Sequence, residues 1–224
     1  GGLYYTTARG VNWYHDAASP LTVYDLVPSP ANDGSLYVAA TDAAKGGPVY
    51  KRSSSGEWAS LVNFPSGREP VISLAASRPG TSDQVWAGTE AYGMYYSTNG
   101  GTSWTTGCDG STRNTVPTVL SLAISHNSSP LLLEGRADKL FKSTGNPPGA
   151  VCTPTTPLLR IQAIAFEPLW DGSKYCHIYV GTPRGLFLKG CAIPGSFSPP
   201  KVVDAKAVAL ANGMRGAFIG SGSQ

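Results

Sequence analysis

The sequence has little charge and no long apolar run. Charged residues make up 14% of the 224 residues, and the formal net charge is only +3. No run of Lys and Arg marks a nucleic-acid surface, and no apolar segment approaches the roughly 20 residues that a membrane-spanning helix needs. We therefore expect a soluble chain that binds no nucleic acid and has no membrane span.

Signatures of common cofactors and catalytic groups are missing as well. The three histidines, His15, His126 and His177, have no metal-ligand spacing. The chain has no phosphate-binding loop and no Gly-x-Ser-x-Gly elbow. Its four cysteines match neither CxxC nor CxxCH, which argues against zinc and covalent haem. We expect no cofactor and no metal ion.

Glycine, proline and aromatic residues are plentiful instead. The chain has 27 Gly, 18 Pro, 11 Tyr and 5 Trp. This composition suits many short strands joined by turns and is poor for long helices. The sequence therefore predicts a mostly β protein.

An eight-residue pattern recurs along the chain. Residues 97–104 (STNGGTSW) align with residues 6–13 (TTARGVNW), so that a hydroxyl residue, Gly and Trp coincide, and residues 53–58 hold a shortened copy. The tryptophans Trp13, Trp58 and Trp104 are 45 and 46 residues apart. Two degenerate copies continue this spacing toward the C-terminus. Such a period indicates a repeat architecture.

Two further markers keep the same period. One is the end of an apolar strand, at residues 40–41, 88–89, 135–136, 181–182 and 221–222. The other is the strand before it, at residues 23–27, 71–76, 119–124, 161–166 and 207–210. Each unit thus has strands a, b, c and d, with a turn between c and d. Antiparallel four-stranded units repeated radially make a β-propeller.

We predict an all-β, five-bladed propeller in a single domain of residues 1–224. The chain ends after a strand b and begins with strands c and d, so the N-terminal strands would complete the C-terminal blade and close the ring. A fragment of a larger propeller is the alternative. The expected blades span residues 17–62, 63–110, 111–155, 156–200, and 201–224 with 1–16.

The eight-residue pattern resembles the Asp-box, or BNR, repeat, Ser/Thr-x-Asp-x-Gly-x-Thr/Ser-Trp. This resemblance implies a turn between strands c and d, in which hydroxyl and amide side chains satisfy backbone groups, Gly has a positive φ and Trp is buried. Sialidases, xyloglucan-cleaving hydrolases, sortilin-type receptors and photosystem II assembly factors carry such boxes, so the box names no single function. The structural residues expected are Ser97, Asn99, Gly101, Trp104, Thr6, Gly10, Trp13, Gly56 and Trp58.

The cysteine positions fit disulfides in this architecture. If Gly181 pairs with Leu186 across a b–c hairpin, two cysteines face each other directly. The other two follow strand d in neighbouring blades. Disulfides favour an oxidising, secreted or periplasmic location, whereas free buried thiols are the alternative. The expected bridges are Cys176–Cys191 and Cys108–Cys152.

Propellers bind ligands mostly at the channel mouth, which the b–c and d–a loops form. Polar and aromatic residues of these loops are binding candidates, although loops are also polar simply because they are hydrated. Trp170, in an a–b connection, is a candidate exposed anchor for a partner. The full set is Asp42, Arg68, Glu90, Tyr92, Glu134, Arg136, Trp170 and Arg184.

Catalysis is the weaker hypothesis. Glu90 and Glu134 occupy equivalent loops of adjacent blades and could form the carboxyl pair of a glycosidase, which needs a separation of roughly 5–9.5 Å. Neither lies in a hydrolase motif, and the Arg-Ile-Pro signature of sialidases is absent: Arg160 only begins a similar sequence. We therefore expect a non-catalytic binding or assembly module whose partner is another protein in an extracellular or envelope assembly. A lectin and a glycoside hydrolase are the alternatives.

Overall fold

The computed structural model describes residues 1–42, 46–65, 67, 70–107, 118–125, 130–145, 147–149, 152–155, 160–166, 177–190, 205–210 and 217–221. Within these ranges the only regular secondary structure is β-strand, and all strands pair antiparallel in separate sheets of two to four. No helix suited to crossing a membrane occurs in this part of the chain. The prediction of an all-β fold is confirmed.

Three sheets have four strands each, joined in the order a, b, c, d. The first contains β3 (Thr22–Pro28), β4 (Leu36–Thr41), β5 (Val49–Arg52) and β6 (Trp58–Ser60). The second contains β7 (Val71–Ser77), β8 (Gln84–Thr89), β9 (Met94–Ser97) and β10 (Thr105–Thr106). The third contains β11 (Val119–Ile124), β12 (Leu131–Arg136), β13 (Leu140–Thr144) and β14 (Thr153–Pro154).

The remaining sheets are smaller. The fourth contains β15 (Ala163–Phe166), β16 (His177–Thr182) and β17 (Gly185–Gly190). A fifth contains β18 (Ala205–Leu210) and β19 (Ala217–Ser221), and a separate hairpin contains β1 (Tyr4–Tyr5) and β2 (Tyr14–His15). The expected pairing of the N-terminal strands with β19 is not present in the structure, because each pair forms its own sheet.

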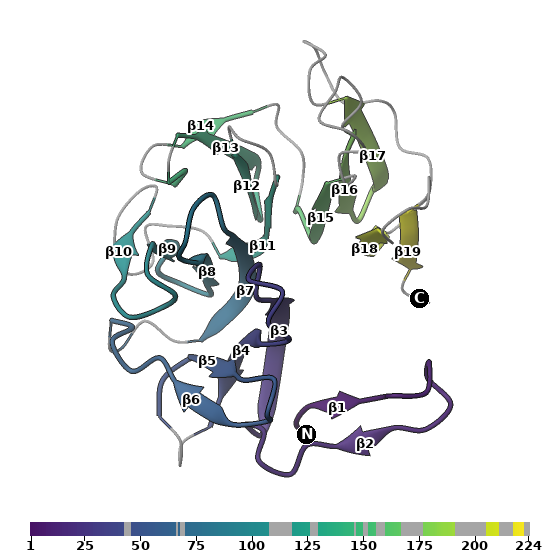
Figure 1. Cartoon of the computed structure of the whole chain (residues 1–224). Coiled ribbons are helices and arrows are strands. Elements are labelled where there is room, and N and C mark those ends of the chain that lie inside the picture. Colours follow the sequence, from purple (N-terminus) through teal and green to yellow (C-terminus); the bar gives the residue numbers. More distant parts are fainter. Residues whose placement is uncertain are drawn as a thin grey trace.

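The sheets follow one another along an arc (Figure 1), with the N-terminal hairpin near one end and β18–β19 at the other. Successive first strands pack together: β3 contacts β7, β7 contacts β11, β11 contacts β15 and β15 contacts β18. Each complete sheet has a β-bulge at the same place in its first strand, after Val23, Val71 and Val119. The recurring bulge shows that the sheets repeat one backbone plan.

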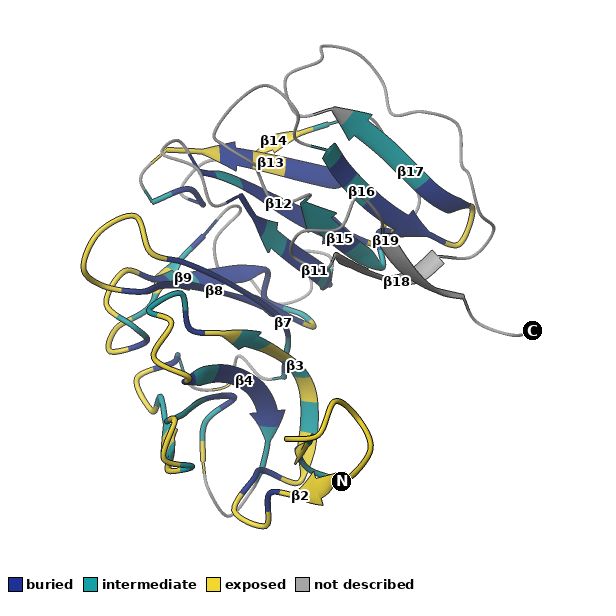
Figure 2. Ribbon diagram, turned by 45° about the vertical axis from the view of Figure 1, so that its right-hand side comes forward, coloured by how far each residue is buried: buried dark blue, intermediate teal, exposed yellow. Residues whose placement is uncertain are grey.

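The core lies between neighbouring sheets, where strands are buried on both faces (Figure 2). Trp86, which is fully buried, packs with Met94 from its own sheet and with Val119 and Leu132 from the third sheet. Burial of a large apolar side chain contributes about 1.5–3 kcal/mol. The close approach of the second and third sheets also depends on a glycine, since a Cβ at Gly88 would lie only 2.5 Å from Cγ1 of Val119.

Candidate functional site

A polar pocket of about 230 Å³ lies between the first and second sheets. Its lining comes from the β3–β4 connection, from β4 and β5, from the β7–β8 connection and from the β9–β10 turn. The charged and amide side chains that line it are Asp33, Lys51, Arg78, Asp83 and Asn99.

The Asp83 side chain connects residues from both sheets at the pocket. One of its carboxylate oxygens, Oδ2, accepts hydrogen bonds from Ser29 Oγ at 2.6 Å and from Tyr37 OH at 2.8 Å. The other, Oδ1, is 3.6 Å from Nη1 of Arg78. Burial, together with the hydrogen bond to the Asp83 carboxylate, raises the pKa of Tyr37 far above its ordinary value. Tyr37 therefore stays protonated and donates its hydrogen bond, and the Asp83 carboxylate has a structural role.

The accessible charges of the pocket are of both signs. Hydrogen bonds from the Ser35 hydroxyl and backbone amide lower the pKa of Asp33, so this exposed side chain is a carboxylate at neutral pH. Nζ of Lys51 lies 5.1 Å from the centre of the Tyr37 ring, and Arg78 is partly exposed. Among the described residues, no group of three or more His, Cys, Asp or Glu side chains could hold a metal ion. The pocket suits recognition of polar and charged groups.

The turn between β9 and β10 contributes Asn99 and Gly100 to the pocket. The Ser97 hydroxyl accepts hydrogen bonds from the amides of Asn99 (3.3 Å) and Gly101 (2.8 Å), and Asn99 Oδ1 accepts one from the Ser103 amide at 2.9 Å. Gly101 has a φ of 89°, and a Cβ there would clash with the Leu61 side chain. The hydrogen bonds and the positive φ are those expected from the sequence.

The other two copies of the pattern form related turns. The Thr6 hydroxyl accepts a hydrogen bond from the Gly10 amide at 3.0 Å, and Gly10 also has a φ of 89°. The Ser53 hydroxyl accepts one from the Glu57 amide at 2.9 Å, with Gly56 at a φ of 92°. In all three turns a hydroxyl oxygen thus accepts a hydrogen bond from the amide four residues later; that amide belongs to glycine in two turns and to Glu57 in the third.

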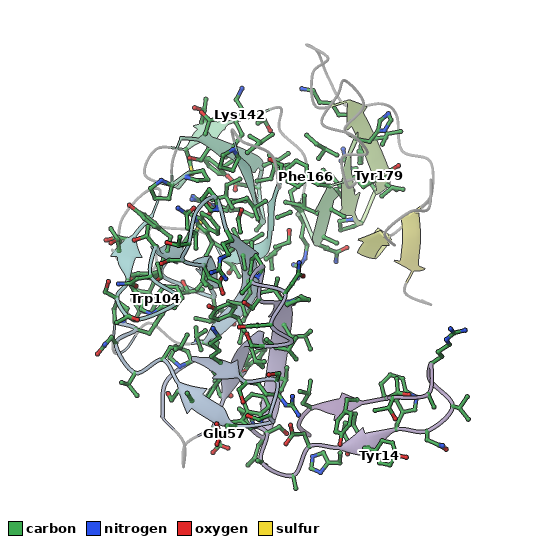
Figure 3. The ribbon with its side chains drawn as sticks, viewed as in Figure 1. Tyr14, Glu57, Trp104, Lys142, Phe166 and Tyr179 are labelled. Carbon is green, nitrogen blue, oxygen red and sulfur yellow. The ribbon has the colours of Figure 1, made fainter. Side chains whose placement is uncertain are left out.

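The three tryptophans of these turns have different surroundings. Trp104 is half-buried and makes an edge-to-face contact with Phe64 at 5.1 Å (Figure 3). Trp58 is also half-buried, and its Nε1 donates a hydrogen bond to Asp16 Oδ2 at 3.2 Å. Trp13 is 62% exposed, so the expectation that it would be buried is wrong. No described segment covers Trp13 as Phe64 covers Trp104.

Asp16 makes several structural contacts that the sequence did not indicate. Its Oδ2 forms an ion pair with Nε of Arg52 at 2.7 Å in addition to its bond with Trp58. Burial alone would raise the pKa of Asp16, but the hydrogen bonds from Arg52 and Trp58 outweigh burial and hold the pKa below its ordinary value. Asp16 thereby fastens the N-terminal hairpin to the first sheet.

Two of the expected channel-mouth residues are not loop residues. Glu134 and Arg136 belong to β12 and are 1% and 2% exposed. Oε1 of Glu134 is 2.6 Å from Nε of Arg136, whose guanidinium lies 4.1 Å from the centre of the Phe141 ring. The prediction of accessible loop side chains is wrong here, because residues two apart on a strand share one face, and this face is covered.

The other candidates are dispersed. Tyr92 is 7% exposed and packs in the core with Tyr95 and Phe64, so the expectation of an exposed aromatic is wrong. Glu90 is exposed at the end of the second sheet, and Arg184 is exposed in the β16–β17 turn. The remaining three sites differ in status: Asp42 is half-buried, whereas Arg68 and Trp170 lie outside the described residues.

Of the four cysteines, Cys152 is described, and it takes part in a disulfide. Its expected partner Cys108 lies outside the described residues, as do Cys176 and Cys191. The β16–β17 hairpin has the expected pairing of Gly181 with Leu186, and the pairing extends to His177 and Gly190. The predicted Cys176–Cys191 bridge is consistent with this backbone register.

Comparison with known proteins leaves the fold as the main finding. No protein-family model matches the chain, and no curated protein matches it. The chain is similar to the extracellular domain of a candidate one-component system, BT4673, from B. thetaiotaomicron (TM-score 0.68, 15% identity). It is also similar to the computationally designed protein Ika8 (TM-score 0.57, 15% identity). The match to BT4673 covers 98% of this chain but only 29% of the BT4673 chain. The match to Ika8 covers 89% of this chain and 55% of the Ika8 chain.

Proposed function

We propose that this chain is a non-catalytic binding or assembly module that works outside the cytoplasm, in a secreted or periplasmic location. We further propose that its sheets are the blades of a five-bladed propeller of Asp-box type. Support for the kinship comes from the turns at Thr6 and Ser97, in which the side-chain hydroxyl accepts a hydrogen bond from the glycine amide four residues later. Support for the location comes from the disulfide at Cys152 and from the extracellular domain that shares the fold.

The main support for a non-catalytic role is the buried, ion-paired environment of Glu134. A glycosidase needs two carboxyl groups facing the substrate, one of which is an acid with a raised pKa. Glu134 is buried and ion-paired with Arg136, whereas Glu90 is exposed. Asp33, the accessible carboxylate of the pocket, has a lowered pKa, which is the wrong direction for a general acid.

The polar pocket is the proposed contact site for a protein partner. Asp33 and Arg78 present opposite charges, with Lys51 beside them, at its opening between two sheets. Paired charges of both signs complement the charged side chains of another protein surface and favour specificity over raw affinity.

The test is quantitative affinity capture from the secreted or periplasmic fraction of the source. We expect a stoichiometric protein partner that is retained by the chain and lost by the double variant Lys51→Ala/Arg78→Ala. Lys142→Ala is the matched control, because Lys142 is exposed on the third sheet, away from the pocket (Figure 3).

Two results would overturn the proposal. One is hydrolysis of a glycoside by the purified chain that is lost in Glu90→Gln. The other is glycan binding on an array, in the absence of any protein partner, that depends on Lys51 and Arg78, which would indicate a lectin.

A further inference from the structure

Two cationic side chains of the polar pocket have hydrogen-bond donors that the described residues do not use. Nζ of Lys51, on β5, lies 5.1 Å from the centre of the Tyr37 ring and forms no hydrogen bond or ion pair with any described residue. The Arg78 guanidinium donates one hydrogen bond, to the Thr81 carbonyl, and its Nη1 is 3.6 Å from Asp83 Oδ1, which is too far for another. Since a guanidinium has five N–H donors, both cationic side chains keep donors for a ligand.

The position of the Lys51 ammonium is set by the Tyr37 ring. This ring is fully buried, and the 2.8 Å hydrogen bond from its hydroxyl to Asp83 holds it in place. The face of an aromatic ring attracts a cation, so the ammonium is held at the pocket before a ligand arrives. A side chain that is already ordered loses little conformational entropy on binding.

The nearby carboxylate of Asp33 does not pair with Lys51. Asp33 Oδ1 accepts hydrogen bonds from the Ser35 amide at 2.9 Å and from the Ser35 hydroxyl at 2.5 Å. These bonds, and more weakly the positive charge of Lys51, lower the pKa of Asp33. No ion pair joins the two side chains, both of which are described. The Lys51 ammonium can therefore pair with a group from outside the chain.

Neutral donors lie beside Arg78. The exposed hydroxyl residues Thr81 and Ser82 line the pocket from the β7–β8 connection, which also carries Arg78. A hydroxyl group can turn its O–H toward a negatively charged oxygen, and hydrogen bonds from a cation to such an oxygen are stronger than neutral ones. Lys51, Arg78 and the hydroxyl groups therefore suit an oxyanion.

The charge balance of the pocket favours an oxyanion with a single charge. The lining has two cations, Lys51 and Arg78, and two carboxylates, those of Asp33 and Asp83. The cost of removing an ion from water grows with the square of its charge, whereas its attraction to the lining grows only in proportion to that charge. A lining without net charge therefore disfavours a doubly charged phosphate. A carboxylate has one charge and two acceptor oxygens, enough for both cations.

We propose that the pocket binds a carboxylate, supplied by an exposed Asp or Glu side chain of the partner protein, through Lys51 and Arg78. This carboxylate site rests on the contact role proposed above and names the group that the partner supplies. A sugar acid fits the pocket less well, because sugar rings commonly stack on an exposed aromatic face. Tyr37, the aromatic residue among the described lining residues, is fully buried.

Substitution of Asp33 distinguishes an anionic ligand from a cationic one. A carboxylate ligand is repelled by Asp33 and attracted by Lys51, and a cationic ligand experiences the reverse. Asp33→Asn is therefore expected to tighten carboxylate binding about two- to fivefold, the Coulomb effect of one charge a few ångströms away near a protein surface. Lys51→Gln is expected to weaken carboxylate binding about tenfold, because a charge-assisted hydrogen bond is lost.

The test is an NMR titration of the full chain with a blocked glutamate, N-acetyl-glutamic acid α-amide, whose side-chain carboxylate is its only charge. The equivalent blocked glutamine is the matched neutral ligand. We expect saturable shifts of the Asp83 and Gly100 backbone amide signals with the blocked glutamate and none with the blocked glutamine. Lys142→Gln is the control variant and should bind like the unsubstituted chain, because Lys142 is exposed on the third sheet, away from the pocket (Figure 3).

Equal shifts with the two blocked amino acids would overturn the carboxylate site, and this comparison depends on no variant. Weaker binding of the blocked glutamate by Asp33→Asn would also overturn it and would indicate a cationic ligand. Glucuronic acid that binds much more tightly than the blocked glutamate would overturn a protein as the source. A captured partner that depends on Lys51 and Arg78, without a response to the blocked glutamate, would disprove the carboxylate alone. A response to the blocked glutamate without any captured partner would instead disprove the contact role.

Discussion

At the scale of single residues, buried charge is the feature with the largest energetic consequence. Removing a carboxylate and a guanidinium from water is costly, and the cost is offset only when geometry is good. Glu134 and Arg136 achieve this with a 2.6 Å ion pair, to which the Phe141 ring adds a cation–π contact. Loss of one partner leaves the other charge buried without its main counterion.

Arg136→Met is expected to lower the free energy of unfolding by about 3–5 kcal/mol. Arg184→Met is the matched control, because Arg184 is exposed in a turn and surface changes usually stay within about 0.5 kcal/mol. Urea unfolding of both variants measures the difference. Equal midpoints for the two variants would mean that the pair does not stabilise the fold.

The pH dependence of stability is argued at the same scale, from Asp16. Its pKa is lower in the folded chain than the ordinary 3.8, so Asp16 stabilises the fold above that value and loses this contribution as the pH falls through the folded-state pKa. Asp16→Asn should lower stability at pH 7 by about 1–3 kcal/mol, since hydrogen bonds to a charged group are lost. The gap between the two proteins should close in acid, as followed by urea titrations at several pH values. A gap that stayed constant down to about pH 2 would show that ionisation of Asp16 is not the cause.

At the scale of elements, the c–d turn is the repeated unit. Its glycine is required for conformation in all three copies, since Gly10, Gly56 and Gly101 have φ values of 89°, 92° and 89°. Only Gly101 has a second constraint, because a Cβ there would meet the Leu61 side chain of the first sheet, whereas the space at Gly10 is open. The same residue type therefore has a purely local role in one turn and an additional packing role in the other.

Gly10→Ala should cost about 1 kcal/mol, the penalty for a non-glycine residue at positive φ. Gly101→Ala should cost about 2–4 kcal/mol, because overpacking adds to that strain. Thermal unfolding of both variants tests the difference. Introducing Leu61→Ala should reduce the effect of Gly101→Ala and leave that of Gly10→Ala unchanged; equal effects in both backgrounds would contradict the packing role.

At the scale of the whole molecule, the predicted Cys108–Cys152 disulfide would link two neighbouring sheets. Cys152 follows the short strand β14 of the third sheet, and its expected partner, Cys108, follows β10 of the second. A bridge between them would constrain the unfolded chain across a loop of some 45 residues, which contributes several kcal/mol in the chain-entropy model.

Reduction with dithiothreitol is expected to lower the free energy of unfolding by about 2–5 kcal/mol. In Cys108→Ser/Cys152→Ser, reduction should have a smaller effect, because one bridge has already been removed. Peptide mapping without reduction should recover the pairs Cys108–Cys152 and Cys176–Cys191. Recovery of any other pair for Cys152 would disprove the predicted connectivity.

The strands and turns of this protein were predictable from the sequence because they depend on neighbours in the chain. Apolar strands at a repeat of about 46 residues located β7, β8 and β11 to within a residue or two. The hairpin register at Gly181 and Leu186 was predictable for the same reason, since a tight turn sets the pairing on both sides. A Glu and an Arg two residues apart in a strand could also have signalled the Glu134–Arg136 pair.

Burial was decided by the tertiary structure alone. The sequence does not say which sheet face another sheet will cover, so Tyr92 and Glu134, interpreted as accessible, lie in the interior, and Trp13, interpreted as buried, is exposed. The polar pocket arises in the same way, because Asp33, Arg78 and Asn99 come together only when two sheets pack. The sequence by itself determined the local strand pairing and the turn chemistry. Packing between sheets, which depends on contacts far apart in the chain, determined which side chains can meet a partner.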